Sequence, residues 1–294
     1  MLAEQNGVSD QLARERPRLK ERLFVGLCSM AALLPVGLVL LLVGAIAVSA
    51  LGRLNWSFFA GYPSRFADRA GILPGLAGSA LLMALTALLA LPVGIGSAIY
   101  LEEYSGRSRW VALIESNVAS LAAAPSVIYG LLGLGVFVRA MGLGRSVLAG
   151  AATLALLILP LVIDSARGAL RSVPQPLREA CHALGMTRWQ AIRSIVLPMA
   201  LPAIVTGAIR ALSRALGETA PLLVVGALSY VTFLPAGVQA PFTALPVQIF
   251  NWVLRPEKEF LANAAAGIIV LFGALLLLNA FALVLRSWLE KRST

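Results

Sequence analysis

Three charged side chains interrupt an apolar stretch in the last third of the sequence. Within residues 201–228 they recur at intervals of four positions: Arg210, Arg214 and Glu218. On a continuous helix this spacing places them on one face, within about 12 Å of one another. A guanidinium is always protonated, and its planar fork matches the oxygens of a phosphate or a carboxylate. Two guanidiniums on one face therefore favour an oxyanion, and we expect Glu218 to pair with Arg214 when no anion is bound.

A simpler interpretation of these residues is an internal ion pair that only neutralises buried charge. Charged residues inside a membrane segment are expensive, and they normally face protein or water. The group carries two positive charges and one negative charge, so an anion would compensate its net positive charge. This imbalance favours a place on the path of a transported anion.

The composition of the 294-residue chain is that of a membrane protein. Hydrophobic residues make up 59% of it and charged residues 13%, whereas soluble domains are about 45–50% apolar and about 25% charged. In a soluble protein the net charge of +10 would indicate a nucleic-acid partner. Here the basic residues flank apolar runs, where they set topology. We therefore predict an integral membrane protein that contacts lipids and binds no nucleic acid.

Residue types suited to metal or nucleotide chemistry are scarce. Cys28, Cys181 and His182 are the only cysteines and histidine, which is too few for a metal site or a disulfide framework. A phosphate-binding loop needs a lysine directly after a glycine, and no lysine of this chain follows one. The sequence therefore predicts no metal, no bound cofactor and no nucleotide site. It also lacks the residue sets of a membrane enzyme.

The apolar runs predict six membrane-spanning helices. They lie between Arg22 and Arg53 and over 72–100, 116–138, 146–163, 201–228 and 261–285. Pro125 and Pro160 should kink their helices, either to shape a path or as ordinary structural features. The long connection 229–260 is either a plain loop or includes a helix that dips into the bilayer. We expect the second, because 242–254 is largely apolar.

The basic residues predict the orientation of these helices. Lysine and arginine are concentrated in the tail 1–22, in 102–115 and 164–198, and at the C-terminal end 291–294 together with Arg286. Positive residues favour the cytoplasmic side, and an even number of spans places both termini there. We predict an all-α membrane protein with a basic tail over 1–22 and one transmembrane domain over 23–290.

The cytoplasmic segment has the pattern of a short amphipathic helix followed by a turn. Pro174 and Pro176 suit a helix start, and four residues then share one face: Leu177, Ala180, Cys181 and Leu184. Gly185 suits the left-handed position after a helix. Such a helix fits the groove of a partner protein, although it could also rest on lipid headgroups.

The spacing within Glu179–Pro198 resembles the EAA loop of permease subunits of bacterial ABC importers. It has Glu-Ala-Cys, three residues, a glycine, nine residues and Ile-Val-Leu-Pro, with Cys181 at the place of the second alanine. The resemblance implies a coupling helix within 178–198 that docks on an ATPase subunit. The residues that would carry the coupling are Glu179, Ala180, Cys181, Gly185, Ile195, Leu197 and Pro198.

A second run, Arg-Ala-Leu-Gly-Glu-Thr-Ala-Pro-Leu-Leu over 214–223, looks like the signature of the A-type permease of phosphate-specific ABC importers. Segments 98–104, 124–130 and 245–250 resemble the same family. This implies the six-helix permease fold of type I importers in the bacterial cytoplasmic membrane. It places Arg214, Glu218 and Arg171 on the substrate path, and Arg210 is added from its helical spacing.

The same resemblance implies the partners of the chain. They are a homologous C-type permease, two copies of an ATPase that uses ATP and Mg²⁺, and a periplasmic or lipid-anchored phosphate-binding protein. The chain itself would not be an enzyme. An importer of phosphonate, sulfate or molybdate stays open, because importers of many substrates share the EAA loop. An ion-coupled secondary transporter would need no such loop.

Overall fold

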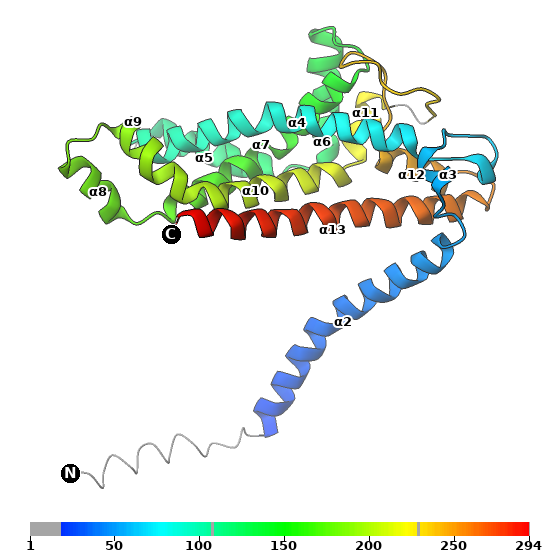
Figure 1. Ribbon diagram of the computed structural model, residues 1–294, viewed down its shortest axis with the longest axis horizontal. Coiled ribbons are helices and arrows are strands. Elements are labelled where there is room, and N and C mark those ends of the chain that lie inside the picture. The colour runs from blue at the N-terminus through cyan, green and yellow to red at the C-terminus, as the bar shows by residue number, and fades with distance from the viewer. Residues whose placement is uncertain (1–18, 107–108, 228–229, 294) are drawn as a thin grey trace. The chain divides into compact units, whose positions relative to one another are not determined.

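The computed structural model of the protein describes residues 19–106, 109–227 and 230–293, and its regular secondary structure there is helical (Figure 1). The predicted all-α architecture is confirmed. Most of the predicted tail 1–22, and Thr294 of the predicted C-terminal end, lie outside the described residues. The domain boundaries predicted from the sequence stay a prediction.

Helix α2 (Leu19–Ala50) coincides with the first predicted span and, up to Ser49, belongs to a compact unit of its own. It has 32 residues and passes through Pro35 without a break. At 1.5 Å per residue it is about 48 Å long, more than the roughly 30 Å of a bilayer core. This length and its apolar composition suit a helix that crosses the membrane.

The second unit, from Ala50 onward, is built around α7 (Val147–Arg171). Helices α4 (Leu73–Ile99) and α10 (Leu197–Gly217) pack against α7, and α13 (Phe260–Ser293) packs against α10. In the most apolar 18-residue stretch of α7, 67% of the residues are buried, compared with 6% in the corresponding stretch of α13. Helix α7 is therefore the centre of this unit, whereas α13 keeps apolar faces open to lipid or another subunit.

Small residues allow the neighbouring helices to approach α7 closely. A Cβ atom at Gly94 of α4 would lie 2.6 Å from the Val162 side chain, and one at Gly207 of α10 would lie 2.6 Å from Ser165. Lipid tails are as apolar as leucine, so association within a bilayer depends on such close packing rather than on the hydrophobic effect.

The predicted third span is broken rather than kinked. Helix α5 (Arg109–Ala122) and the segment formed by α6 (Ser126–Gly133) and the π-helix η3 (Leu134–Ala140) meet at 104°. Pro125 lacks an N–H group and disfavours the helical conformation of the preceding residue, which explains the break. Among the described residues five helices are long and apolar enough to cross a membrane, or six if this bent pair is one span.

The predicted fifth span also ends earlier than expected. Helix α9 (Arg188–Ala191), the π-helix η4 (Ile192–Val196) and α10 run on from one another, but α10 ends at Gly217 and Glu218 is extended. The ring of Pro221 would clash with the carbonyl of Gly217 if the helix continued. A separate short helix, α11 (Ala220–Val225), follows the break. The prediction of one uninterrupted helix over 201–228 is therefore wrong.

The remaining elements join these helices at their ends. Helix α4 continues into the π-helix η2 (Tyr100–Tyr104), and α8 (Gln175–Ala183) follows α7, which runs through Pro160 as one helix. At the opposite end lie α3 (Trp56–Ala60), η1 (Ala67–Arg69) and α12 (Leu245–Val253). Helix α12 lies within the predicted connection 229–260 and packs against α4 and α13. The connection thus includes a helix, and its dipping into the bilayer stays a prediction.

Candidate functional site

The predicted pairing of Arg214 and Glu218 is present. Nε of Arg214 lies 3.7 Å from Oε1 of Glu218, and the two side chains are 46% and 17% exposed. Arg214 belongs to the last turn of α10, and Glu218 directly follows that helix. Glu218, the first residue after the break, therefore partly neutralises the Arg214 guanidinium.

The expectation that three charged residues share one helical face is wrong for Glu218, because it lies in the extended residue after α10. Arg210 and Arg214 are one turn apart on α10, and both are exposed in this unit. Their neighbours Ala211 and Ala215 are buried in the core. The two guanidiniums thus line the face of α10 that its own unit leaves open.

The broken segments α5–α6 and α10–α11 lie against each other near this ion pair. A Cβ atom at Gly130 of α6 would lie 2.8 Å from Cα of Pro221 in α11, so only a glycine allows this approach. The Tyr129 hydroxyl of α6 donates a hydrogen bond to the carbonyl of Leu121, 2.6 Å away on the other side of the α5–α6 break. Tyr129 also shares a core cluster with Ala211 and Ala215 of α10, which lie on either side of Arg214 in the sequence. Two interrupted helices therefore meet beside Arg214.

Tyr129 has no role in the sequence-based site, although it lies in the segment 124–130 that carries part of the family resemblance. Only its contact across the break and its closeness to Arg214 draw attention to it. The nearest signal in the sequence is Pro125, which predicts an interruption close to a polar aromatic residue.

Arg171 lies away from the other predicted path residues. It ends α7, and its neighbour Leu170 shares a core cluster with Val196 at the end of η4 and Ala200 at the start of α10. Further along, Gly207 of α10 lies against Ser165 of α7, so the two helices run antiparallel. Arg214 is seven residues beyond Gly207 and Arg171 is six residues from Ser165 in the opposite direction, which separates them by about 20 Å along the helix axes. The structure therefore does not bring Arg171 together with Arg214 and Glu218.

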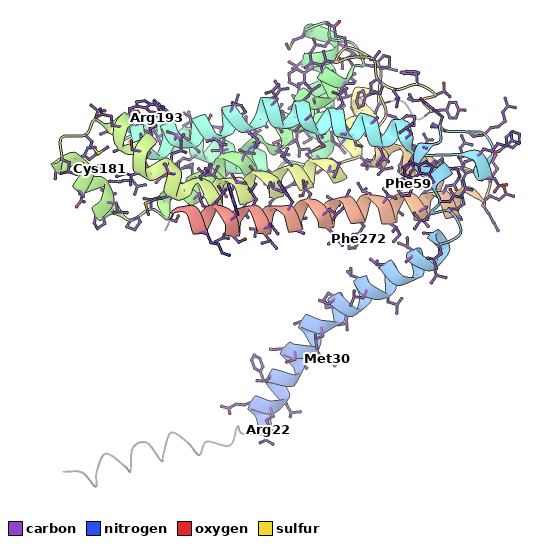
Figure 2. All side chains as sticks on the ribbon, viewed as in Figure 1. Arg22, Met30, Phe59, Cys181, Arg193 and Phe272 are labelled. Carbon is purple, nitrogen blue, oxygen red and sulfur yellow. The ribbon has the colours of Figure 1, made fainter. Side chains whose placement is uncertain are left out.

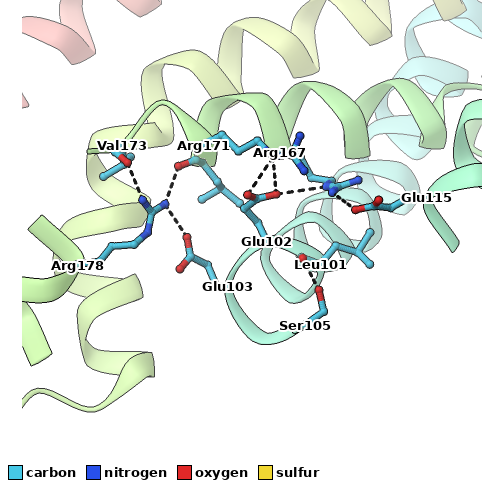
Figure 3. Close-up of polar contacts among 10 residues, drawn as sticks. Leu101, Glu102, Glu103, Ser105, Glu115, Arg167, Arg171, Val173 and Arg178 are labelled. Carbon is cyan, nitrogen blue, oxygen red and sulfur yellow. Dashed lines mark hydrogen bonds and ion pairs between the residues drawn. The ribbon is translucent and has the colours of Figure 1, made fainter. Parts of the chain in front are cut away.

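Arg171 instead belongs to a group of ion pairs that we call the glutamate–arginine cluster. Its members lie on η2, α5, α7 and α8: Glu102, Glu103, Glu115, Arg167, Arg171 and Arg178 (Figure 3). Nε of Arg171 donates to both oxygens of Glu102, at 3.0 and 2.9 Å. Arg167 pairs with Glu102 at 3.5 Å and also with Glu115. This cluster was not predicted from the sequence.

Arg178 connects three elements at this end of the unit. From α8 it donates to the carbonyls of Val173 at 2.6 Å and Leu170 at 2.8 Å, which cap the C-terminal end of α7. It also donates to Oε1 of Glu103 on η2, at 2.9 Å. The side chains of Arg178 and Glu103 are only 15% and 9% exposed.

The predicted helix and turn of the coupling segment are confirmed. Helix α8 ends at Ala183, and Gly185 has the left-handed φ of +78°. Thr187 and Gln190 form a capping box that starts α9. Cys181 of α8 and Arg193 of η4 lie at the same end of the unit (Figure 2).

The apolar face of α8 is only partly buried by its own chain. Cys181 is buried, whereas Leu177 is 37% exposed and Leu184 is 82% exposed. Glu179 and Ala180 are exposed as well. The other predicted coupling residues lie where η4 passes into α10: Ile195 and Leu197 are half-buried, and Pro198 is exposed. Leu177 and Glu179 of α8, and Leu184 directly after it, are thus exposed.

In the described ranges no group of histidine, cysteine, aspartate and glutamate side chains is arranged to hold a metal ion. Two of the polar features of the second unit are the Arg214–Glu218 pair and the glutamate–arginine cluster. They lie at opposite ends of the α7–α10 pair.

Comparison with known proteins gives the family. A family model described as "Binding-protein-dependent transport system inner membrane component" matches residues 90–294. The chain belongs to this family. Its sequence is 37% identical over 216 residues to the phosphate transport system permease protein PstA of Yersinia pestis, covering 73% of this chain and 72% of that protein. It is 34% identical over 252 residues to PstA 1 of Mycobacterium tuberculosis, covering 85% of this chain and 79% of that protein.

A third relative matches nearly the whole chain. It is a probable ABC transporter permease protein, YqgI, of Bacillus subtilis, 28% identical over 291 residues and covering 94% of this chain and 98% of that protein. Membership of the family makes the chain a multi-pass membrane protein and a permease subunit of an ABC importer.

Solved structures of ABC importers share the fold. A bacterial alginate ABC transporter matches with a TM-score of 0.63 at 16% identity, covering 90% of this chain and 96% of that one. The MetNI methionine ABC transporter, in an inward-facing conformation, matches with a TM-score of 0.60 at 19% identity, covering 72% and 94% of the two chains. The predicted permease fold of type I importers is therefore confirmed.

Proposed function

We propose that this chain is the A-type permease subunit of an ATP-driven importer of inorganic phosphate and forms half of its translocation path. The observation that carries the proposal is the Arg214–Glu218 pair, which lies on an open face of α10 beside two broken helices. The similarity to phosphate transport permeases from several bacteria supports phosphate as the substrate.

Arg214 can exchange the carboxylate of Glu218 for a phosphate ion. In the absence of substrate the carboxylate of Glu218 partly neutralises Arg214, at a distance of 3.7 Å. A guanidinium presents donors in a planar fork, so an arriving phosphate offers a better-matched set of oxygens than one side of a carboxylate. Phosphate then displaces Glu218, and the return of Glu218 to Arg214 helps to release phosphate. Arg210 adds positive charge one turn away on the same open face.

The other half of the proposed function lies at α8. Leu177 and Leu184 are exposed on one face of α8 and its C-cap, and Glu179 is exposed on the opposite face. A short helix with an exposed apolar face suits a groove in an ATPase subunit. In this assignment the α8 end and both termini are cytoplasmic. A homologous C-type permease would complete the path, two ATPase copies would bind the two coupling helices, and ATP and Mg²⁺ would bind to the ATPase. A periplasmic or lipid-anchored phosphate-binding protein would dock at the opposite end.

The test is transport by the complete complex. The chain would be purified with its second permease and ATPase, reconstituted in liposomes, and supplied with its binding protein and radiolabelled phosphate. We expect ATP-dependent uptake of phosphate that an excess of sulfate, molybdate or phosphonate does not suppress. Uptake of one of those anions without uptake of phosphate would assign the chain to a related oxyanion importer.

A further inference from the structure

We propose that the contact between Glu103 of η2 and Arg178 of α8 transmits movement of the coupling helix to α4. The proposal rests on the proposed function, because it assumes that an ATPase subunit moves α8. It adds a second route into the membrane-spanning helices, besides the covalent chain that leads from α8 through α9 and η4 into α10.

The first support for this route is the geometry of Arg178. Its guanidinium binds the carboxylate of Glu103 at 2.9 Å and the carbonyls of Leu170 and Val173 at 2.8 and 2.6 Å. One side chain of α8 is therefore fixed at once to the end of α7 and to the extension of α4 (Figure 3). A planar guanidinium that makes several hydrogen bonds resists rotation. Helix α8 therefore cannot move alone without breaking the hydrogen bonds of Arg178.

The second support is the partial burial of the pair. The Glu103 and Arg178 side chains are 9% and 15% exposed, and both line a pocket that is open to solvent. Removing one partner leaves the other charge less well solvated than at the surface, which carries a cost. The pair therefore stays closed while α8 moves, unlike an exposed ion pair, which exchanges readily with water.

The third support is that the two glutamates of η2 bind different helices. Glu102 binds Arg171 and Arg167 on α7, whereas the next residue, Glu103, binds Arg178 on α8. The backbone carbonyl of Glu103 also accepts a 3.4 Å hydrogen bond from Arg188 of α9. The π-helical turn that carries both glutamates is a rare conformation that is frequent at functional sites. Since η2 directly continues α4, a displacement of α8 is passed along α4.

The consequence is that α8 acts on both helices that enclose α7. The covalent chain moves α10, which carries Arg214, and the Glu103–Arg178 contact moves α4. A purely structural ion pair would only stabilise the fold. The two roles differ in a measurable quantity, namely the number of phosphate ions imported for each ATP hydrolysed.

The test compares Glu103→Gln, Arg178→Gln and the double variant in the reconstituted complex, with Arg109→Gln as the matched control. Arg109 is an exposed arginine at the start of α5, at the same end of the unit but outside the segment 178–198. For each complex we would measure phosphate uptake, ATP hydrolysis stimulated by the loaded binding protein, and thermal stability.

We expect each single variant to retain ATP hydrolysis and assembly while phosphate imported per ATP falls about tenfold, a typical size for coupling between sites. The double variant should be no worse than either single variant, because both remove the same contact. The Arg109→Gln control should keep the wild-type ratio. An unchanged ratio in both single variants would overturn the proposal, and so would a parallel loss of assembly, hydrolysis and uptake, which indicates a structural role. Failure of the wild-type complex to import phosphate would instead refute the proposed function.

Discussion

Replacing Glu218 by glutamine removes the charge that competes with a substrate anion for Arg214. At the observed 3.7 Å, the attraction between the two charges is about 1 kcal/mol in bulk water and about 4 kcal/mol at an effective dielectric constant of 20. Arg214 is 46% exposed, so the lower part of this range applies. A gain of about 1–2 kcal/mol corresponds to roughly five- to thirtyfold tighter binding of phosphate at Arg214. We also expect slower import, because the carboxylate that assists release is missing.

Two measurements check this prediction. Equilibrium binding of radiolabelled phosphate to the purified permease pair, without the binding protein, reports the affinity at Arg214, and uptake into liposomes reports import. Glu257→Gln serves as the control, since it removes one carboxylate from the exposed segment between α12 and α13. Unchanged binding together with normal uptake in Glu218→Gln would show that the ion pair takes no part in transport.

The other predictions concern three positions. Arg214→Ala should abolish phosphate uptake and leave assembly intact, whereas Arg214→Lys should retain part of the uptake because it keeps the charge without the planar fork; full uptake by the alanine variant would contradict the anion path. Gly185→Val places a β-branched side chain at a φ of +78°, at a cost of about 1–2 kcal/mol, and should disturb the turn behind α8. Its complex should lose the ATP hydrolysis stimulated by loaded binding protein, and normal stimulation would show that this turn is not needed for coupling. Gly130→Val forces α6 away from Pro221, which a Cβ atom at position 130 would approach to 2.8 Å. We expect a loss of about 1–3 kcal/mol of stability, seen as a lower melting temperature of the purified complex, while Gly135→Val on the same segment has free space and should melt as the wild type does.

Features set by local rules were predictable from the sequence. The start of α8 at two prolines, the left-handed Gly185 and the second helix after the turn follow from residue preferences over a few positions. The Arg214–Glu218 pair was predicted as well, because four residues bring two side chains together even where the helix ends between them. These interactions depend on short separations along the chain.

Features set by contacts between distant segments were not predictable in this way. Pro125 indicated a bend, but the 104° angle depends on how α6 packs against α11. Arg171 and Arg214 were placed on one path by resemblance, although the antiparallel packing of α7 and α10 puts them at opposite ends. Glu103 and Arg178 are 75 positions apart, and nothing in either local sequence indicates that they meet.

The small residues at the crossings of α7 have a mechanical consequence. At Gly94 the Val162 side chain of α7 occupies the space that a Cβ atom would take, and at Gly207 the Ser165 side chain does the same. Each glycine therefore forms a notch that receives a side chain of α7. Packed contacts of this kind change between discrete arrangements and do not slide gradually. The notches thus fix the register of α4 and α10 against α7, so a displacement that reaches either helix is passed to α7 as well.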